Sequence, residues 1–294
     1  MIQPEFLKKG DTIGIVACAR KISAEELQPA IDILKSWGLN VKTEKNIFNI
    51  NHQFSGTDEE RAEDLQTMLN DSSIKAIISA RGGYGTVRII DKIDFTIFKK
   101  APKWIVGYSD ITVLHSHIHN MGIQTLHATM PINFGVDADA TNSLRKVLFG
   151  ETIEYNIPTH PLNKKGTAEG ILIGGNLSLL YALCGSASDI DTKEKILFIE
   201  DLDEYLYHID RMMMNLKRSG KLSGLAGLVV GGMSDMKDNT VPFGKTAEEI
   251  ILDAVKEYTY PVCFNFPAGH IDKNMALVFG KKVNLRVSEN VVIL

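Results

Sequence analysis

Short apolar segments alternate with helix-forming segments through the first 120 residues, and this alternation restricts the fold more than any other feature. The apolar segments lie at residues 12–17, 39–43, 74–80 and 103–106. Apolar residues at helical spacing lie between them, at 27–34 and 62–69, and a Ser/Thr-x-x-Glu capping box precedes each helix. Strands that alternate with helices form a parallel sheet with right-handed crossovers. We therefore expect an N-terminal α/β domain with a flavodoxin- or Rossmann-like parallel sheet.

The alternation lapses between residues 130 and 167, where Pro and Gly punctuate the chain. A chain of 294 residues is long enough for two domains. We expect an N-terminal domain at 1–135, a linker at 136–167 and a smaller C-terminal α/β domain at 168–294. The elements expected in the C-terminal domain are strands at 168–174, 195–201 and 225–232, helices at 176–183 and 245–258, and a β-rich end with short runs at 276–279, 283–287 and 291–294.

Composition and charge exclude several classes of partner. The formal net charge is -4 and there is no basic run, so nucleic acid is not an expected partner. No apolar run approaches the roughly 20 residues of a membrane helix, and the first residues lack the apolar core of an export signal, which predicts a cytoplasmic protein. Cys18, Cys184 and Cys263 lie far apart in apolar contexts, which favours buried reduced thiols over a disulfide framework or a zinc site.

A serine at the turn after the strand at 103–106 is the first candidate catalytic residue. The segment WIVGYSDITVLH at 104–115 is typical of a strand, a sharp turn and a helix, with Ser109 at the turn. A hydroxyl at such a turn lies above the sheet edge, and the backbone N–H groups that follow point toward the atom it attacks. Serine is also a preferred helix N-cap, so the segment by itself leaves both roles open.

A glycine-rich segment, RGGYG at 81–85, follows the neighbouring strand and is expected at the same edge of the sheet. Glycines let backbone N–H groups approach a ligand without a side chain between them, as an oxyanion hole requires, although a tight turn needs glycines as well. The segment lacks the Gly-Lys-Ser/Thr of a phosphate loop and the spacing of a dinucleotide fingerprint. We therefore expect no nucleotide cofactor.

A catalytic serine needs a base and usually a carboxylate that orients the base. His270 follows Pro267-Ala268-Gly269 after an apolar run, and Glu200 lies at the end of the strand at 195–201. The neighbouring acids Asp201, Asp203 and Glu204 remain alternatives for the acid.

His115 and His119 have the i,i+4 spacing of metal ligands, but no acidic partner with zinc-hydrolase spacing accompanies them. We interpret these two histidines as residues of a helix surface and expect no metal.

Several motifs, taken together in their order and spacing, resemble the LD-carboxypeptidase family. These motifs are RGGYG at 81–85, GYSD at 107–110, GGNL at 174–177, FIED at 198–201, IDR at 209–211 and PAGH at 267–270. The family, the S66 serine peptidases, includes murein tetrapeptide carboxypeptidases and microcin C immunity proteins. The resemblance implies Ser109 as the nucleophile, Glu200 as the acid and His270 as the base. It also implies an oxyanion hole formed by backbone N–H groups of Asp110 and, in the glycine-rich segment, Gly83.

The same resemblance implies a cytoplasmic homodimer that removes a terminal D-alanine from muropeptides during cell-wall recycling, at a site in the cleft between the domains. The resemblance also implies a second possibility, the immunity branch of the family, which cleaves aminoacyl or peptidyl nucleotides. Members of that branch carry an aromatic residue in a loop of the second domain. Residues 186–192 contain no aromatic side chain, which favours the carboxypeptidase branch. Family members often have a bulkier or proline-containing segment at 203–207, so the peptide pocket is expected to differ in shape here.

Two other classes remain as alternatives. A non-catalytic protein that binds peptides or muropeptides has no need for Ser, Glu and His at three strand ends. An α/β-hydrolase esterase would carry Gly-x-Ser-x-Gly, but Ile111 occupies the position of the second glycine.

Overall fold

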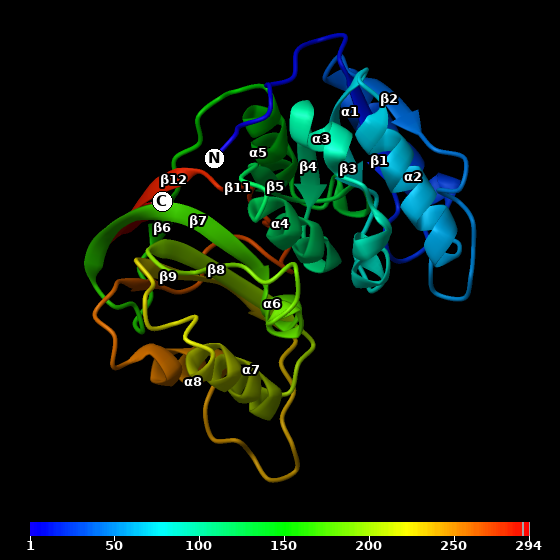
Figure 1. Cartoon of the computed structure of the whole chain (residues 1–294). Helices are drawn as coiled ribbons and strands as arrows, with labels where there is room; N and C mark the ends of the chain where they lie inside the picture. Colours follow the sequence, from blue (N-terminus) through cyan, green and yellow to red (C-terminus); the bar gives the residue numbers. More distant parts are fainter. Residues whose placement is uncertain (290, 294) are drawn as a thin grey trace. The chain divides into compact units, whose positions relative to one another are not determined.

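In the computed structural model, which describes residues 1–289 and 291–293, the chain divides into two units (Figure 1). The first unit comprises Met1–Ile153 and Asp272–Val278, and the second comprises Glu154–Ile271 and Phe279–Leu294. Each unit has a sheet, helices and a hydrophobic core of its own. None of the helices in the described residues is long and apolar enough to span a membrane.

The first unit contains a six-stranded sheet in the order β11-β5-β4-β3-β1-β2. The strands are β1 (Thr12–Val16), β2 (Asn40–Thr43), β3 (Ile74–Ser79), β4 (Trp104–Gly107), β5 (Thr125–His127) and β11 (Leu277–Phe279). Neighbouring strands from β2 through β5 run parallel, so the carboxyl ends of β3 and β4 lie side by side at one edge. The predicted parallel sheet is thus confirmed.

Helices of the first unit connect these strands. They are α1 (Ala24–Ser36), α2 (Asp58–Asn70), α3 (Thr96–Lys100), α4 (Thr112–His119) and α5 (Ala138–Leu148), with 3₁₀ turns η1 (Thr86–Arg88), η2 (Ile90–Lys92), η3 (Ser109–Ile111) and η4 (Pro131–Asn133). Both predicted capping boxes are present, at the starts of α1 and α2. The sequence also predicts a short helix at 86–93, after the glycine-rich segment, but these residues form the turns η1 and η2 instead.

The segment 136–167, expected to be a linker, contains helix α5. Its Leu144 and Leu148 are fully buried in the core of the first unit. The backbone N–H of Ala276 donates to Ser143 Oγ at 2.9 Å, which fixes the segment Asp272–Val278 to this helix. The first unit therefore continues to Ile153 and recovers a segment from near the C-terminus, because the Pro and Gly residues near 131 and 150 flank a helix rather than a linker.

The second unit contains a seven-stranded mixed sheet in the order β10-β9-β8-β7-β12-β13-β6. The strands are β6 (Asn156–Pro158), β7 (Gly166–Asn176), β8 (Lys195–Leu202), β9 (Gly227–Ser234), β10 (Val262–Cys263), β12 (Lys282–Val287) and β13 (Val291–Ile293). Strands β7 to β10 pair in parallel, whereas β12, β13 and β6 pair antiparallel. The predicted α/β fold with a β-rich end is confirmed. Leu294, which was expected to end the last strand, lies outside the described residues.

The helices of the second unit are α6 (Leu177–Leu183), α7 (Leu206–Arg218) and α8 (Ala247–Val255). The sequence pattern predicted α6 and α8 but not α7. Helices α7 and α8 lie side by side (Figure 1), and their buried faces share one core with β8 and β9. Of the three cysteines, Cys18 and Cys263 are buried and free, and Cys184 is free but only half-buried.

Candidate active site

Ser109 occupies a strained turn directly after β4. Its φ of 62° lies in the left-handed region, which a residue with a Cβ rarely adopts. The preceding Tyr108 is extended and is the N-cap of η3, and Ile111 is the N-cap of α4. Ser109 is therefore not a helix N-cap. A serine held in a strained strand-to-helix turn is typical of a nucleophile whose hydroxyl must be presented to a substrate.

The glycine-rich segment at 81–85 lies directly against this serine. A Cβ added to Gly82 would lie 2.8 Å from both Cβ and Oγ of Ser109, so only a glycine permits this approach. Gly83 has a φ of +117°, which also favours glycine. The segment thus brings backbone to the nucleophile without intervening side chains, the arrangement that an oxyanion hole requires.

His115, expected on a helix surface, is buried instead, with 1% of its area exposed. Its Nε2 lies 2.9 Å from the carbonyl oxygen of Gly107, and its Nδ1 lies 2.8 Å from Oγ1 of Thr125. Burial lowers the pKa of His115 to about 4, so the ring is neutral at pH 7. Nε2–H then donates to the carbonyl of Gly107, two residues before Ser109, and Nδ1 accepts from the Thr125 hydroxyl.

The predicted base and acid of the second unit lie in contact. His270 Nδ1 is 2.6 Å from Glu200 Oε2, and the backbone N–H of His270 donates to the same oxygen at 3.1 Å. Glu200 is fully buried in β8, and 13% of the His270 side chain is exposed. A Cβ added to Gly269, whose φ is +107°, would lie 2.6 Å from Glu200 Cβ. The loop before His270 therefore approaches the carboxylate only because this residue is glycine.

This contact determines the charge of the imidazole. Burial lowers the pKa of His270, but the negative charge of Glu200 and the hydrogen bond to it outweigh burial and raise the pKa above its ordinary value. An imidazole that binds a buried carboxylate through Nδ1 is held in one tautomer, with Nε2 as the atom that accepts a proton. The pair thus has the chemistry of a general base and its orienting acid.

The other acids near Glu200 have different partners. Asp201 accepts hydrogen bonds from Asn176 and from the backbone and hydroxyl of Ser178, and burial followed by the charge of Glu200 raises its pKa to about 6. Asp203 pairs with Lys237 at 2.6 Å, and Glu204 pairs with His208 at 2.5 Å.

Within residues 1–289 and 291–293, no group of three or more His, Cys, Asp or Glu side chains is arranged to hold a metal.

Comparison with known proteins matches both halves of the chain to models of one family. The model described as the LD-carboxypeptidase N-terminal domain matches residues 13–128, and the model of the LD-carboxypeptidase C-terminal domain matches residues 169–285. The "Probable murein peptide carboxypeptidase" of Bacillus subtilis is 39% identical over 99% of this chain and 94% of its own. The "Murein tetrapeptide carboxypeptidase" of Pseudomonas aeruginosa is 26% identical over 92% of this chain and 91% of its own.

Solved structures resemble the whole chain. The muramoyltetrapeptide carboxypeptidase from Oxalobacter formigenes has a TM-score of 0.86 at 27% identity, with 96% of this chain and 97% of that chain covered. The microcin C7 self immunity protein MccF has a TM-score of 0.88 at 21% identity, with 100% of this chain and 98% of that chain covered. At that identity, the second similarity establishes a common fold.

Proposed function

The chain belongs to the LD-carboxypeptidase family of serine-type peptidases, and from this premise we propose that it hydrolyses the L,D-peptide bond before the terminal D-alanine of a murein tetrapeptide. The observation that carries the proposal is the buried contact of 2.6 Å between His270 and Glu200, together with the strained turn at Ser109. The substrate class is proposed from the names of the similar B. subtilis and O. formigenes proteins, which are murein peptide and muramoyltetrapeptide carboxypeptidases.

The proposed mechanism uses a Ser-His-Glu triad. Nε2 of His270 accepts the proton of Ser109, and Oγ of Ser109 bonds to the carbonyl carbon of the L,D-peptide bond. The backbone N–H groups of Asp110 and Gly83 stabilise the oxyanion that forms. The C–N bond then breaks as His270 returns the proton to the amine of D-alanine. Water, deprotonated by the same nitrogen, hydrolyses the acyl-enzyme, and Glu200 stabilises the imidazolium in both steps.

This mechanism needs no metal and no cofactor, because the nucleophile, base, acid and oxyanion donors are all groups of the chain. It requires His270 Nε2 to reach Ser109 Oγ during catalysis. The chain order Ser, Glu, His is compatible with this requirement, since a triad is defined by geometry and roles rather than by order.

We further propose that the protein works in the cytoplasm as a homodimer, on muropeptides released during cell-wall recycling. The free thiols of Cys18, Cys184 and Cys263 support a reducing compartment. The homodimer is proposed from the family resemblance alone.

Mass spectrometry of a purified murein tetrapeptide incubated with the protein tests the activity. We expect the loss of one D-alanine with the wild-type protein and no loss with Ser109→Ala, whose fold circular dichroism would verify. Cleavage by the Ser109→Ala variant would refute the nucleophile. An intact tetrapeptide with both proteins would refute the substrate, and aminoacyl nucleotides would be tested next. If those also stayed intact, a non-catalytic muropeptide-binding protein would become the better explanation.

A further inference from the structure

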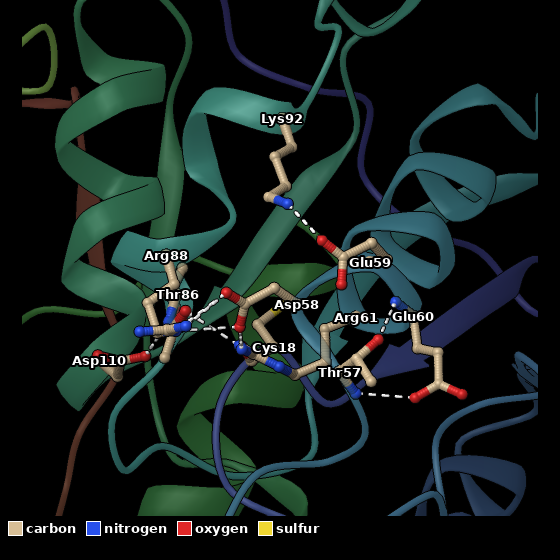
Figure 2. Close-up of polar contacts among 11 residues, drawn as sticks. Cys18, Thr57, Asp58, Glu59, Glu60, Arg61, Thr86, Arg88, Lys92 and Asp110 are labelled. Atoms are coloured by element: carbon tan, nitrogen blue, oxygen red, sulfur yellow. Dashed lines mark hydrogen bonds and ion pairs between the residues drawn. The ribbon is translucent and has the colours of Figure 1, made fainter. Parts of the chain in front are cut away.

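A buried arginine of the first unit, labelled in Figure 2, donates a hydrogen bond to a backbone carbonyl of the glycine-rich segment. Arg61, in helix α2, is 2% exposed. Its Nη1 donates to the carbonyl oxygen of Cys18 at 2.5 Å and to that of Gly85 at 3.0 Å, while Nη2 contacts Asp58. Gly85 must be glycine for this contact, because a Cβ there would lie 2.6 Å from Nη1 of Arg61. The guanidinium thus connects the end of β1 to the end of the glycine-rich segment.

A buried carboxylate, also labelled in Figure 2, accepts a hydrogen bond from the residue that follows this segment. Asp110, the residue after Ser109, is 1% exposed, and its Oδ2 accepts the backbone N–H of Thr86 at 2.7 Å. The carbonyl of Gly85 and the N–H of Thr86 belong to one peptide unit. This peptide unit is therefore bound at its oxygen by Arg61 and at its N–H by Asp110, so that its orientation is fixed at both ends.

Such fixation has a purpose at this position. An oxyanion hole works when its donors are already in place before charge develops, and a shift of about 1 Å at a reacting centre is able to cost about 10²-fold in rate. Gly82, Gly83 and Gly85 have backbone freedom that would otherwise let the segment move relative to Ser109. The backbone N–H of Asp110 is one of the two proposed oxyanion donors, and the other is that of Gly83. The Asp110 side chain therefore fixes the segment that contains Gly83 relative to the backbone of Asp110.

We propose that Arg61 and Asp110 are positioning residues that hold the peptide unit Gly85–Thr86 and thereby fix the oxyanion hole of Ser109. For the peptidase reaction, this inference rests on the proposed function. The two side chains act through the glycine-rich segment and do not touch the substrate. A role in stability alone would change the melting temperature but leave the rate constants of the folded protein unaltered.

Arg88 provides a matched control for Arg61. Both arginines bind Asp58, and both lie over the ring of Phe54, at 4.9 Å for Arg61 and 5.7 Å for Arg88. The Arg88 side chain is 47% exposed, and its link to Gly85 is a backbone hydrogen bond that a side-chain substitution leaves in place. Arg61→Met and Arg88→Met therefore share the loss of the contacts with Asp58 and Phe54, and only Arg61→Met also removes the buried bonds from the guanidinium to the Cys18 and Gly85 carbonyls.

The first readout is the rate at which an alkyl fluorophosphonate labels Ser109, because this reaction does not depend on the identity of the natural substrate. Oγ of Ser109 bonds to phosphorus, the P–F bond breaks, fluoride leaves and the serine proton passes to His270. The phosphoryl oxygen of the adduct occupies the oxyanion position. We expect Arg61→Met to lower the labelling rate constant about 10- to 100-fold, and Arg88→Met to change it less than about twofold. On the tetrapeptide, kcat should fall with Arg61→Met in the same proportion, while KM stays within about threefold.

A second pair of variants keeps the test valid if Arg61→Met fails to fold. Asp110→Ala removes the acceptor of the Thr86 N–H, whereas Asp110→Asn retains an acceptor oxygen at that position. We expect Asp110→Asn to label about tenfold faster than Asp110→Ala, with both variants checked for folding by thermal melts.

Labelling of folded Arg61→Met at the wild-type rate would overturn the proposal, as would equal labelling of Asp110→Asn and Asp110→Ala. If wild type is labelled at Ser109 but leaves the tetrapeptide intact, the proposed function fails and the labelling rates still decide the inference. If wild-type Ser109 is not labelled at all, the nucleophile and the positioning role fail together.

Discussion

At the scale of single residues, the contact between Glu200 and His270 predicts how activity depends on pH. His270 must be neutral to accept the serine proton, and its pKa is raised by Glu200 against the effect of burial. The value of kcat/KM should therefore rise with pH through a pKa above the ordinary value of 6.5. Glu200→Gln removes the charge, so the pKa should fall below that value and the acidic limb should shift to lower pH. Because the imidazolium is then unsupported, kcat should fall by about 10²–10⁴-fold.

The pH profile of kcat/KM for Glu200→Gln, beside that of Glu204→Gln, measures this effect. Glu204 binds His208 at 2.5 Å, so its substitution should leave the position of the acidic limb unchanged. A limb that stays in place in Glu200→Gln would mean that another group sets the charge of His270.

Sequence reasoning at this scale selected the residue types at the strand ends but not the buried groups behind them. Glu200 and His270 were placed by strand ends and by family motifs, and the structure brings them together. His115 was assigned to a helix surface because histidines are common there and no acidic partner indicated a metal site, although its ring is held between Gly107 and Thr125. These contacts depend on the position of β5 beside β4. The spacing of residues within a single helix gives no information about that position.

At the scale of elements, the close approach of the glycine-rich segment to the serine turn predicts a strong effect of one methyl group. Gly82→Ala would place its Cβ 2.8 Å from Cβ and Oγ of Ser109, so either the segment or the nucleophile must move. We expect kcat to fall by about 10²-fold or more, with little change in the melting temperature. The measurement is kcat on the tetrapeptide together with a thermal melt.

Gly224→Ala is the matched control for this substitution. Its Cβ would meet Lys193 Cγ at 3.5 Å, an ordinary van der Waals distance, and it lies in the second unit. Activity of Gly224→Ala should match that of wild type. Full activity of Gly82→Ala would show that the segment is free to move away from Ser109 without cost to catalysis.

Element prediction succeeded where apolar spacing was unbroken and failed where it was diluted. Strands β1, β3 and β4 and both capped helices were expected from their patterns. Helix α7 was missed because its buried face consists of Ile209, Met212, Met213 and Leu216 among charged residues, directly after an acidic loop. Residues 86–93 form the two 3₁₀ turns η1 and η2 rather than the predicted short helix.

At the scale of the whole molecule, the assignment of chain segments to the two units was the least predictable feature. The composition shift near residues 130–167 indicated a change of domain, but the return of Asp272–Val278 to the first unit depends on contacts between distant segments. Ala276 and Leu277 are apolar like the residues of many short strands, so their sequence does not indicate to which of the two units they belong. Their burial in the first unit is a tertiary property.

This return segment predicts a stability effect at a position remote in sequence from the rest of the first unit. Leu277, in β11, is 2% exposed, and both tryptophans, Trp37 and Trp104, pack in the core of the first unit. Leu277→Ala leaves a cavity beside β11 of the first unit's sheet, so it should lower the free energy of unfolding by about 2–5 kcal/mol. Tryptophan fluorescence during urea unfolding measures this, because it reports on the first unit. Val241→Ala, at a position that is 82% exposed, should leave the transition unchanged. An unaltered tryptophan transition in Leu277→Ala would mean that the return segment does not support the sheet that carries Ser109.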